Sequence, residues 1–351
     1  MENNGIMDGA ALYPQSAMMI SSPIDALLRQ QGIDGPFQMT SIRSGRNSLV
    51  VLLSNGTGEW IVKSYYSHST DKRDRLAVEF GFLQFLNNEG VTGICRALGE
   101  DRASRSALYS FLPGSRPKVI RSEHIVQAAN FIGEVNRFRG SSVGMQLPEA
   151  ADACFSIADH IRLAENRISL LLRLAPASQI ESEAHFFVKE QLQPLFIELN
   201  KRISNQIDPS EWSKQLSAED RVLSPSDFGF HNTLEYNGSL FFVDFEYAGW
   251  DDPAKLICDF FCQPELPVST SQGVQFMEEL LLGLPNPFAM IERVKLLLPV
   301  HRLKWCCILL NEFRLEDRER RLHAGVESIG LLDKQLGKAK QYFDHHLAML
   351  T

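Results

Sequence analysis

The polar residues whose types and spacing best fit a chemical role form one constellation. Asp227 is followed five residues later by Asn232, and Asp244 ends the apolar stretch 240–243. Phosphoryl transfer needs a carboxylate that orients the acceptor hydroxyl and takes its proton, and hard oxygen ligands that hold Mg²⁺. We expect Asp227 to be the base, and Asn232 and Asp244 to be the metal ligands. Each residue alone would be an ordinary turn or strand-end residue, and only the set favours a functional site.

The same chemistry needs partners earlier in the chain. Lys63 lies in an apolar strand pattern, where its charge would neutralise the α- and β-phosphates of a nucleotide. Glu79, on the helix predicted to follow, would hold that lysine. A short polar turn that contains Gly45 and Asn47 would cover the phosphates. Most lysines and glutamates at such places merely face solvent, so it is their order along the chain that is informative.

The elements that must position these residues begin with a small α+β unit. Alternating or β-branched apolar runs predict strands, an Asn-Gly turn joins two of them, and a stripe of leucine and phenylalanine predicts one helix. The predicted strands are 37–43, 48–53, 59–65 and 107–112, and the predicted helix is 72–88.

After Pro117 the pattern changes to long helices, with apolar residues three to four positions apart. They are predicted at 122–139, 156–174 and 181–203, and again from Asp252 onward, and a hairpin around Asn237 interrupts them. We expect a flexible leader over 1–22, a nucleotide-binding lobe over 23–112, and a helical lobe with the catalytic and metal-binding loops over 113–351.

With these residues in this order, the chain resembles the aminoglycoside phosphotransferase and choline kinase family. Asp227 and Asn232 match the last part of that family's H-G-D-x-x-x-x-N segment, and Asp244 with Glu246 matches its D-x-E strand end. The Gly45 turn resembles its nucleotide loop. The resemblance implies an α+β fold like that of protein kinases, with a small β-rich lobe and a larger helical lobe.

The resemblance also implies the ligands. ATP would be the co-substrate and Mg²⁺ the metal, and Lys63 with Glu79 would be the family's phosphate-binding pair. The segment 107–114 resembles the hinge strand, so the backbone around Ser110 and Leu112 would hydrogen-bond adenine.

Two positions depart from the family pattern. Pro225 and Ser226 stand where the family has His-Gly. That histidine supports the loop and is not the base, so its loss does not remove the chemistry. His231, directly before Asn232, is also unusual, and we interpret it as an imidazole that packs within the loop.

The acceptor side is less constrained. Glu246, Trp250 and Asp251 follow the metal aspartate and can face the acceptor, and Glu312 interrupts the apolar helical run 303–313, where an ordinary helix-end carboxylate is the alternative. We expect a small hydroxyl compound: first a sugar or aminosugar, then an aminoglycoside, then choline or another amino alcohol. No aromatic, acid-rich box for a quaternary ammonium is apparent in the sequence.

Composition excludes several other classes. The 351 residues contain 35 Lys plus Arg and 43 Asp plus Glu, a net charge of −8, which argues against a nucleic-acid partner. The six cysteines show neither a disulfide framework nor zinc spacing, so we expect buried thiols in a cytoplasmic protein. We expect no signal peptide, because Glu2 and Asp8 but no basic residue precede the short apolar stretch near the N-terminus. We expect no membrane span, because no apolar run is long enough. The oligomeric state is not predicted.

Two other functions are compatible with parts of the pattern. A nucleotide-binding pseudokinase or regulator without turnover would explain Pro225 and Ser226, although the essential polar positions are retained. A protein kinase is disfavoured, because about 14 residues separate Asp244 from Asp259, too few for an activation segment.

Overall fold

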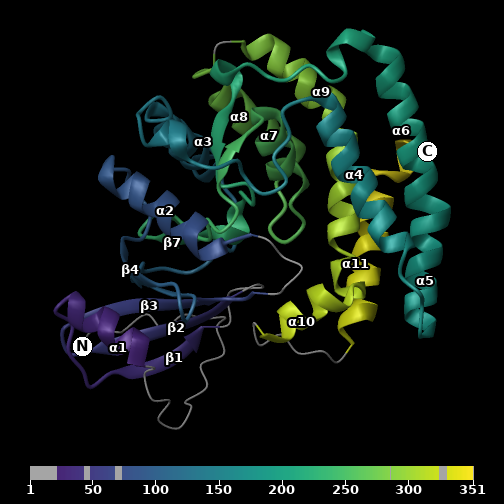
Figure 1. Cartoon of the computed structure of the whole chain (residues 1–351). Coiled ribbons are helices and arrows are strands. Elements are labelled where there is room, and N and C mark those ends of the chain that lie inside the picture. The colour runs from purple at the N-terminus through teal and green to yellow at the C-terminus, as the bar shows by residue number, and fades with distance from the viewer. Residues whose placement is uncertain (1–21, 43–47, 68–72, 285, 324–329, 351) are drawn as a thin grey trace.

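The computed structural model describes residues 22–42, 48–67, 73–284, 286–323 and 330–350. The expected leader, apart from Ser22, lies outside the described residues, and so do Gly45 and Asn47. A small antiparallel sheet near the N-terminus and a larger, mainly helical part make up the molecule (Figure 1). The α+β, kinase-like division into a β-rich and a helical part is therefore confirmed, whereas the lobe boundary near residue 112 stays a prediction.

The N-terminal sheet has five strands in the order β1-β2-β3-β5-β4, all antiparallel to their neighbours. In the tight turn between β2 and β3, the Asn55 side-chain oxygen accepts hydrogen bonds from the backbone of Thr57 and Gly58. The sequence did not predict β4, whose residues alternate little. The strands are β1 (Gln38–Ile42), β2 (Ser48–Asn55), β3 (Gly58–Tyr65), β4 (Ala97–Asp101) and β5 (Ser106–Ser110).

Side-chain alternation gives this sheet two different faces. Val62 and Leu108 point to one face, where α1 (Ser22–Gln30) covers them in a small apolar core. Their strand neighbours Lys63 and Tyr109 point to the other face, toward the helix α2 (Arg75–Asn88) and the helical part of the molecule. The alternation thus places a lysine, and not another valine, on the face that meets the rest of the protein.

The C-terminal part is built from helices with two small strand pairs among them (Figure 1). The predicted helix 181–203 is interrupted by a π-helical segment, Val188–Leu192, between α5 and α6. The α-helices are α3 (Ser122–Arg137), α4 (Ile157–Leu172), α5 (Gln179–Phe187), α6 (Gln193–Gln206), α7 (Pro253–Cys262), α8 (Thr270–Leu281), α9 (Pro287–Ile308), α10 (Leu315–His323) and α11 (Leu331–His346).

The two strand pairs carry the segment that the sequence singled out. β6 (Val222–Ser224) pairs with β9 (Gly249–Asp251), and β7 (Thr233–Tyr236) pairs with β8 (Ser239–Phe242). Residues 225–232 form the loop between β6 and β7, and this loop is anchored by the buried side chains of Phe228 and Phe230. Phe228 packs in a cluster of aromatic rings with Phe131, Phe242, Phe260 and Phe276.

Two further expectations concern the whole chain. All six cysteines are free, and five of them are buried, as expected from their apolar surroundings. Among the described helices, none combines the length and the apolarity that crossing a bilayer requires.

Candidate active site

A cleft of about 720 Å³ lies between the N-terminal sheet and the helical part. Apolar side chains of the sheet, among them Val50 and Ile61, form one wall, and residues 110–112 at the end of β5 also line the cleft. Leu234 and Val243 form part of the opposite wall, beside the polar residues Asn232 and Asp244. The cleft is therefore apolar at the hinge and polar at its inner end, as a nucleotide requires.

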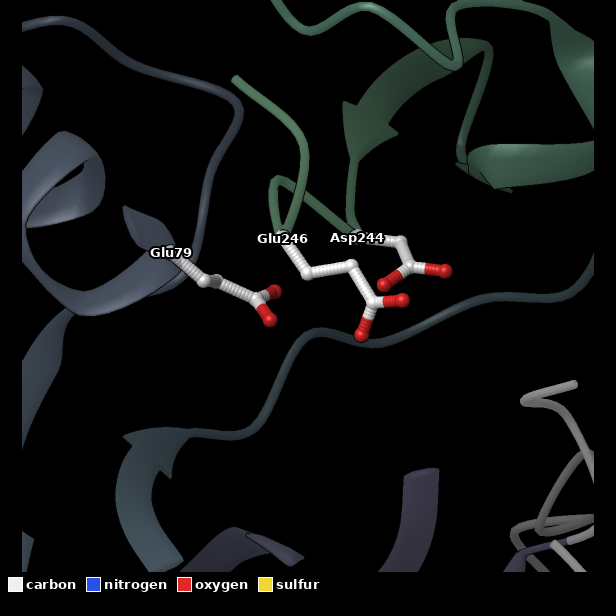
Figure 2. Close-up of side chains that lie close together, drawn as sticks. All are labelled: Glu79, Asp244 and Glu246. Carbon is white, nitrogen blue, oxygen red and sulfur yellow. The ribbon is translucent and has the colours of Figure 1, made fainter. Parts of the chain in front are cut away.

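Lys63 is the central residue of the polar end. Its Nζ lies 2.6 Å from Glu79 Oε2, 2.6 Å from Asp244 Oδ1 and 3.6 Å from Glu246 Oε2. Figure 2 shows Glu79 reaching from α2 toward the segment that carries Asp244 and Glu246. Burial by itself lowers the pKa of Lys63, but the carboxylates of Asp244, Glu79 and Glu246 raise this pKa well above its ordinary value. The ammonium therefore stays charged inside the protein.

Glu79 is fixed by more than this ion pair. The Tyr65 hydroxyl donates to Glu79 Oε2 at 2.8 Å, and the Phe245 backbone N–H donates to Glu79 Oε1 at 3.2 Å. The hydroxyls of Tyr65 and Tyr109 lie 2.7 Å apart behind them. Burial raises the pKa of Glu79, an effect that Lys63 opposes, and burial also raises the pKa of Tyr65, whose hydroxyl therefore remains a donor. These bonds hold α2 close to both halves of the molecule.

The loop after β6 presents Asp227. Its side chain is 34% exposed, and its Oδ1 lies 3.2 Å from Nε2 of His231. Asn232 Nδ2 donates to the Asp227 carbonyl at 3.0 Å, while Asn232 N–H donates to the Gly229 carbonyl at 3.0 Å. The short 3₁₀ turn Phe230–Asn232 thus ties both expected polar residues to one rigid loop.

The oxygen donors at this end suit a hard divalent cation. Carboxylate oxygens of Glu79, Asp244 and Glu246 lie within 4.8 Å of one another. The hydrogen bond of Asn232 uses its amide nitrogen, so the amide oxygen is the atom that a cation would take. Asp244 has a φ of 70°, a left-handed conformation that is uncommon for an aspartate and that reflects a tightly constrained strand end.

A buried ion pair supports the loop from below. Lys255 Nζ lies 2.6 Å from Asp251 Oδ2 and donates to the Ser226 hydroxyl at 3.3 Å. The Ser226 hydroxyl in turn donates to the Ala151 carbonyl at 3.2 Å. Burial by itself lowers the pKa of Lys255, but Asp251 and Asp259 raise it well above its ordinary value. The residue next to Asp227 is therefore held by a permanent buried charge.

The structure brings together Lys63, Glu79, Asp244 and Glu246, and it places Asn232, Ser110 and Leu112 along the same cleft. It separates three residues expected near the acceptor, since none of them lines the cleft among the described residues. Trp250 Nε1 donates to the Gly144 carbonyl at 3.1 Å, Asp251 is fully buried against Lys255, and Glu312 is buried 2.8 Å from Arg321 Nε.

Sequence reasoning missed two residues that bond the polar side chains of this site. Tyr65 follows Lys63 by two residues and so shares its strand face, a signal that alternation alone could have given. His231 follows Asp227 by four residues and faces its carboxylate, whereas we expected an imidazole that only packs.

The sequence agrees with a known family over most of this fold. The model of the phosphotransferase enzyme family matches residues 38–262, which include the sheet, the loop and the strand end with Asp244. The chain belongs to this family. This phosphotransferase has no counterpart among curated proteins that matches it in sequence.

Solved structures resemble this phosphotransferase over nearly its whole length. A spectinomycin phosphotransferase, solved with ADP and spectinomycin, is 12% identical, with a TM-score of 0.58 over 91% of this chain and 98% of that one. An ethanolamine kinase of Plasmodium vivax is 12% identical, with a TM-score of 0.57 over 90% and 86%. A choline kinase of Cryptosporidium parvum is 13% identical, with a TM-score of 0.55 over 94% and 99%. At these identities the likeness establishes the kinase-like fold.

Proposed function

We propose that this phosphotransferase transfers the γ-phosphoryl group of ATP, with Mg²⁺, to a hydroxyl group of a small molecule. The observation that carries the proposal is the position of Lys63, bonded to both Glu79 and Asp244 at the inner end of an apolar cleft. Phosphoryl transfer depends mainly on positioning and on neutralising phosphate charge, and these residues supply both.

The cleft offers residues that would contact the base of the nucleotide and others that would contact its phosphates. The backbone at Ser110 and Leu112 would hydrogen-bond the base, between the apolar walls of the cleft. Lys63, fixed by Glu79, would contact the α- and β-phosphates. We assign Gly45 and Asn47 to the cover over the phosphates from their position in the sequence alone. ADP in the solved spectinomycin phosphotransferase of the same fold supports a nucleotide here.

Asp244 and Asn232 fit Mg²⁺, because both offer hard oxygen donors at the polar end of the cleft. Held by these two residues, Mg²⁺ would supply the positive charge that offsets the charge developing on the transferred phosphoryl group. Asp227 would orient the acceptor hydroxyl and accept its proton. Since Lys63 already occupies one oxygen of Asp244, this lysine both restrains the metal ligand and competes for it.

For the acceptor we propose a sugar or aminosugar, with an aminoglycoside or a choline-like amino alcohol as the alternatives. The aromatic side chains that line the described cleft, Tyr109 and Phe111, lie at the hinge end, where the base would bind. An aromatic cage for a quaternary ammonium would be needed at the other end, near Asp227. Of the residues expected at the acceptor, Glu246 is the one that lines the cleft.

We also propose a cytoplasmic enzyme without a nucleic-acid partner. The support is the acidic charge of −8 and the six free thiols. A nucleotide-binding regulator without turnover is the second candidate, favoured by the Pro225-Ser226 departure from the family pattern.

The test removes the carboxylate of Asp227, the proposed general base. Asp227→Ala should lower kcat by roughly 10²- to 10⁴-fold, the contribution typical of a general base. The Kd for ATP with Mg²⁺, measured by calorimetry, should change little, because Asp227 touches the acceptor and not the nucleotide. Turnover is measured as ADP release with glucosamine, glucose, kanamycin and choline.

Asp333→Ala, which removes an exposed carboxylate at the start of α11, is the matched control and should keep wild-type kcat. Wild-type turnover in Asp227→Ala would refute the assignment of the base. ATP binding without transfer to any of the four acceptors by the wild-type enzyme would favour the regulator.

A further inference from the structure

We propose that His231 is a positioning residue for Asp227: it holds the carboxylate by a hydrogen bond to Oδ1 and so fixes the orientation in which this group meets the acceptor hydroxyl. This inference rests on the proposed function, in which Asp227 is the base. It assigns to His231 a role that the sequence pattern did not suggest.

The direction of the bond follows from the chemistry of the two groups. His231 Nε2 lies 3.2 Å from Asp227 Oδ1. An ionised carboxylate only accepts hydrogen bonds, so Nε2 must carry the hydrogen, and this fixes the tautomer of the ring. The Asp227 side chain is 34% exposed, so the bond orients a carboxylate that solvent can reach.

The loop is shaped to bring this imidazole to the carboxylate. The 3₁₀ turn Phe230–Asn232 places His231 four residues after Asp227, so that the two side chains lie on the same side of the turn. Gly229 makes room for the ring, because a Cβ at this position would lie 3.0 Å from His231 Nδ1 and 3.2 Å from Gln263 Cγ. A larger residue at 229 would push the imidazole away from Asp227.

The remaining contacts of His231 also point to Asp227. The residue is 9% exposed and lines the cleft beside Asn232. In the described part of the chain, its buried Nδ1 has no hydrogen-bond partner. A histidine that served only to brace the loop would be expected to bond the loop backbone with a ring nitrogen. Here the imidazole of His231 instead bonds the carboxylate of Asp227, the proposed general base.

Two substitutions separate positioning from packing. His231→Gln can place an amide N–H near the position of Nε2, whereas His231→Leu keeps the apolar volume and removes the donor. If the bond positions the base, His231→Leu should lower kcat roughly 10- to 100-fold, and His231→Gln should recover most of that loss. The KM for ATP should stay within about twofold in both variants, since neither change touches the phosphate-binding lysine.

The measurements are ADP release with glucosamine as acceptor and with water as acceptor, and ATP binding by calorimetry. His231→Leu in the Asp227→Ala background should cause no further loss, because the group it positions is gone. Equal kcat values for the Gln and Leu variants, or an additive loss in the double variant, would overturn the positioning role. These outcomes leave the proposed function standing, whereas wild-type turnover in Asp227→Ala would overturn the proposed function itself.

Discussion

At the scale of single residues, the loop that carries Asp227 depends on one unusual backbone conformation. Ser226 has a φ of 66°, in the left-handed region that glycine adopts most easily. The related family has glycine at this position. Serine adopts the left-handed conformation less easily than glycine, but it adds a side-chain hydroxyl. That hydroxyl links Lys255 to the loop and to the Ala151 carbonyl.

Comparing Ser226→Ala with Ser226→Gly should separate the two effects. Both variants lose the hydroxyl, but only alanine keeps the strained φ. The free energy of unfolding of the glycine variant should therefore exceed that of the alanine variant by about 1 kcal/mol. Denaturation in urea measures it. If the alanine variant were equally stable or more stable, position 226 would carry no backbone strain.

Residue types and spacing predicted that Lys63, Glu79, Asp244 and Asn232 lie close together, and all four line one cleft. The roles proposed for them require neighbouring positions, so their order along the chain was informative. Asp251 and Glu312 could not be placed in this way, because a carboxylate near an active site and one buried against a cation look alike in sequence. Only the structure shows the partners, Lys255 and Arg321.

At the scale of elements, the connection after β5 determines how the sheet meets the helical part. Gly114 has a φ of 111°, and a Cβ there would lie 2.5 Å from the Glu235 carbonyl oxygen on β7. The next residue, Ser115, exchanges two backbone hydrogen bonds with Glu235, at 3.2 Å and 2.7 Å. The segment that would bind the base is thus fastened to the helical part within three residues of Leu112.

Gly114→Ala should break this attachment. The clash is with backbone and the φ is unfavourable for alanine, so we expect a loss of about 2–3 kcal/mol in the free energy of unfolding, with a higher KM for ATP. Thermal denaturation and steady-state kinetics are the measurements.

Gly133→Ala, at an exposed position of α3 with open space around the Cβ, is the control and should stabilise the protein by up to about 1 kcal/mol. Equal stability of the two alanine variants would show that the attachment is not rigid.

Element types were predictable where the hydrophobic period was regular. Four sheet strands and the helix with Glu79 lie within a few residues of their predicted ends. The helix α1 was missed because Ser22–Gln30 is short and follows residues without a pattern. The π-helical segment was missed because one extra residue leaves the apolar spacing nearly unchanged over any short window.

At the scale of the whole molecule, a chain of buried polar side chains joins three helices. His301 of α9 lies 2.9 Å from His160 of α4, and His160 lies 3.0 Å from Asp252, the N-cap of α7. Burial and then Lys304 lower the pKa of His301 to about 3, although Asp259 acts in the opposite direction. The folded protein therefore keeps this imidazole neutral at pH values where an unfolded chain would protonate it.

This difference predicts an acid-dependent loss of stability. An unfolded histidine binds a proton below pH about 6.5, whereas folded His301 does so only near pH 3, so its contribution is complete above pH 6.5 and is lost as the pH falls toward 3. Between pH 6.5 and 5 the loss should be about 2 kcal/mol. Urea denaturation at several pH values measures it.

His301→Gln should remove this part of the pH dependence, while His185→Gln on α5 controls for the loss of an imidazole from another helix. If the free energy of unfolding of His301→Gln fell between pH 6.5 and 5 as steeply as that of the wild type, other groups would govern the acid sensitivity.

The π-helical segment Val188–Leu192 has a consequence for how related chains can be compared. One additional residue turns everything after it by about 100° around the helix axis. Phe187, before the segment, packs edge-on against Phe343 of α11, whereas α6, after the segment, contacts α4 and α9. In a homologue that lacks this residue, α5 and α6 would be rotated relative to each other, and one of the two would lose the packing described here. A single-residue gap in an alignment at 188–192 would therefore mark a regrouping of the helices and a different shape of the helical part, and not a neutral length change in a loop.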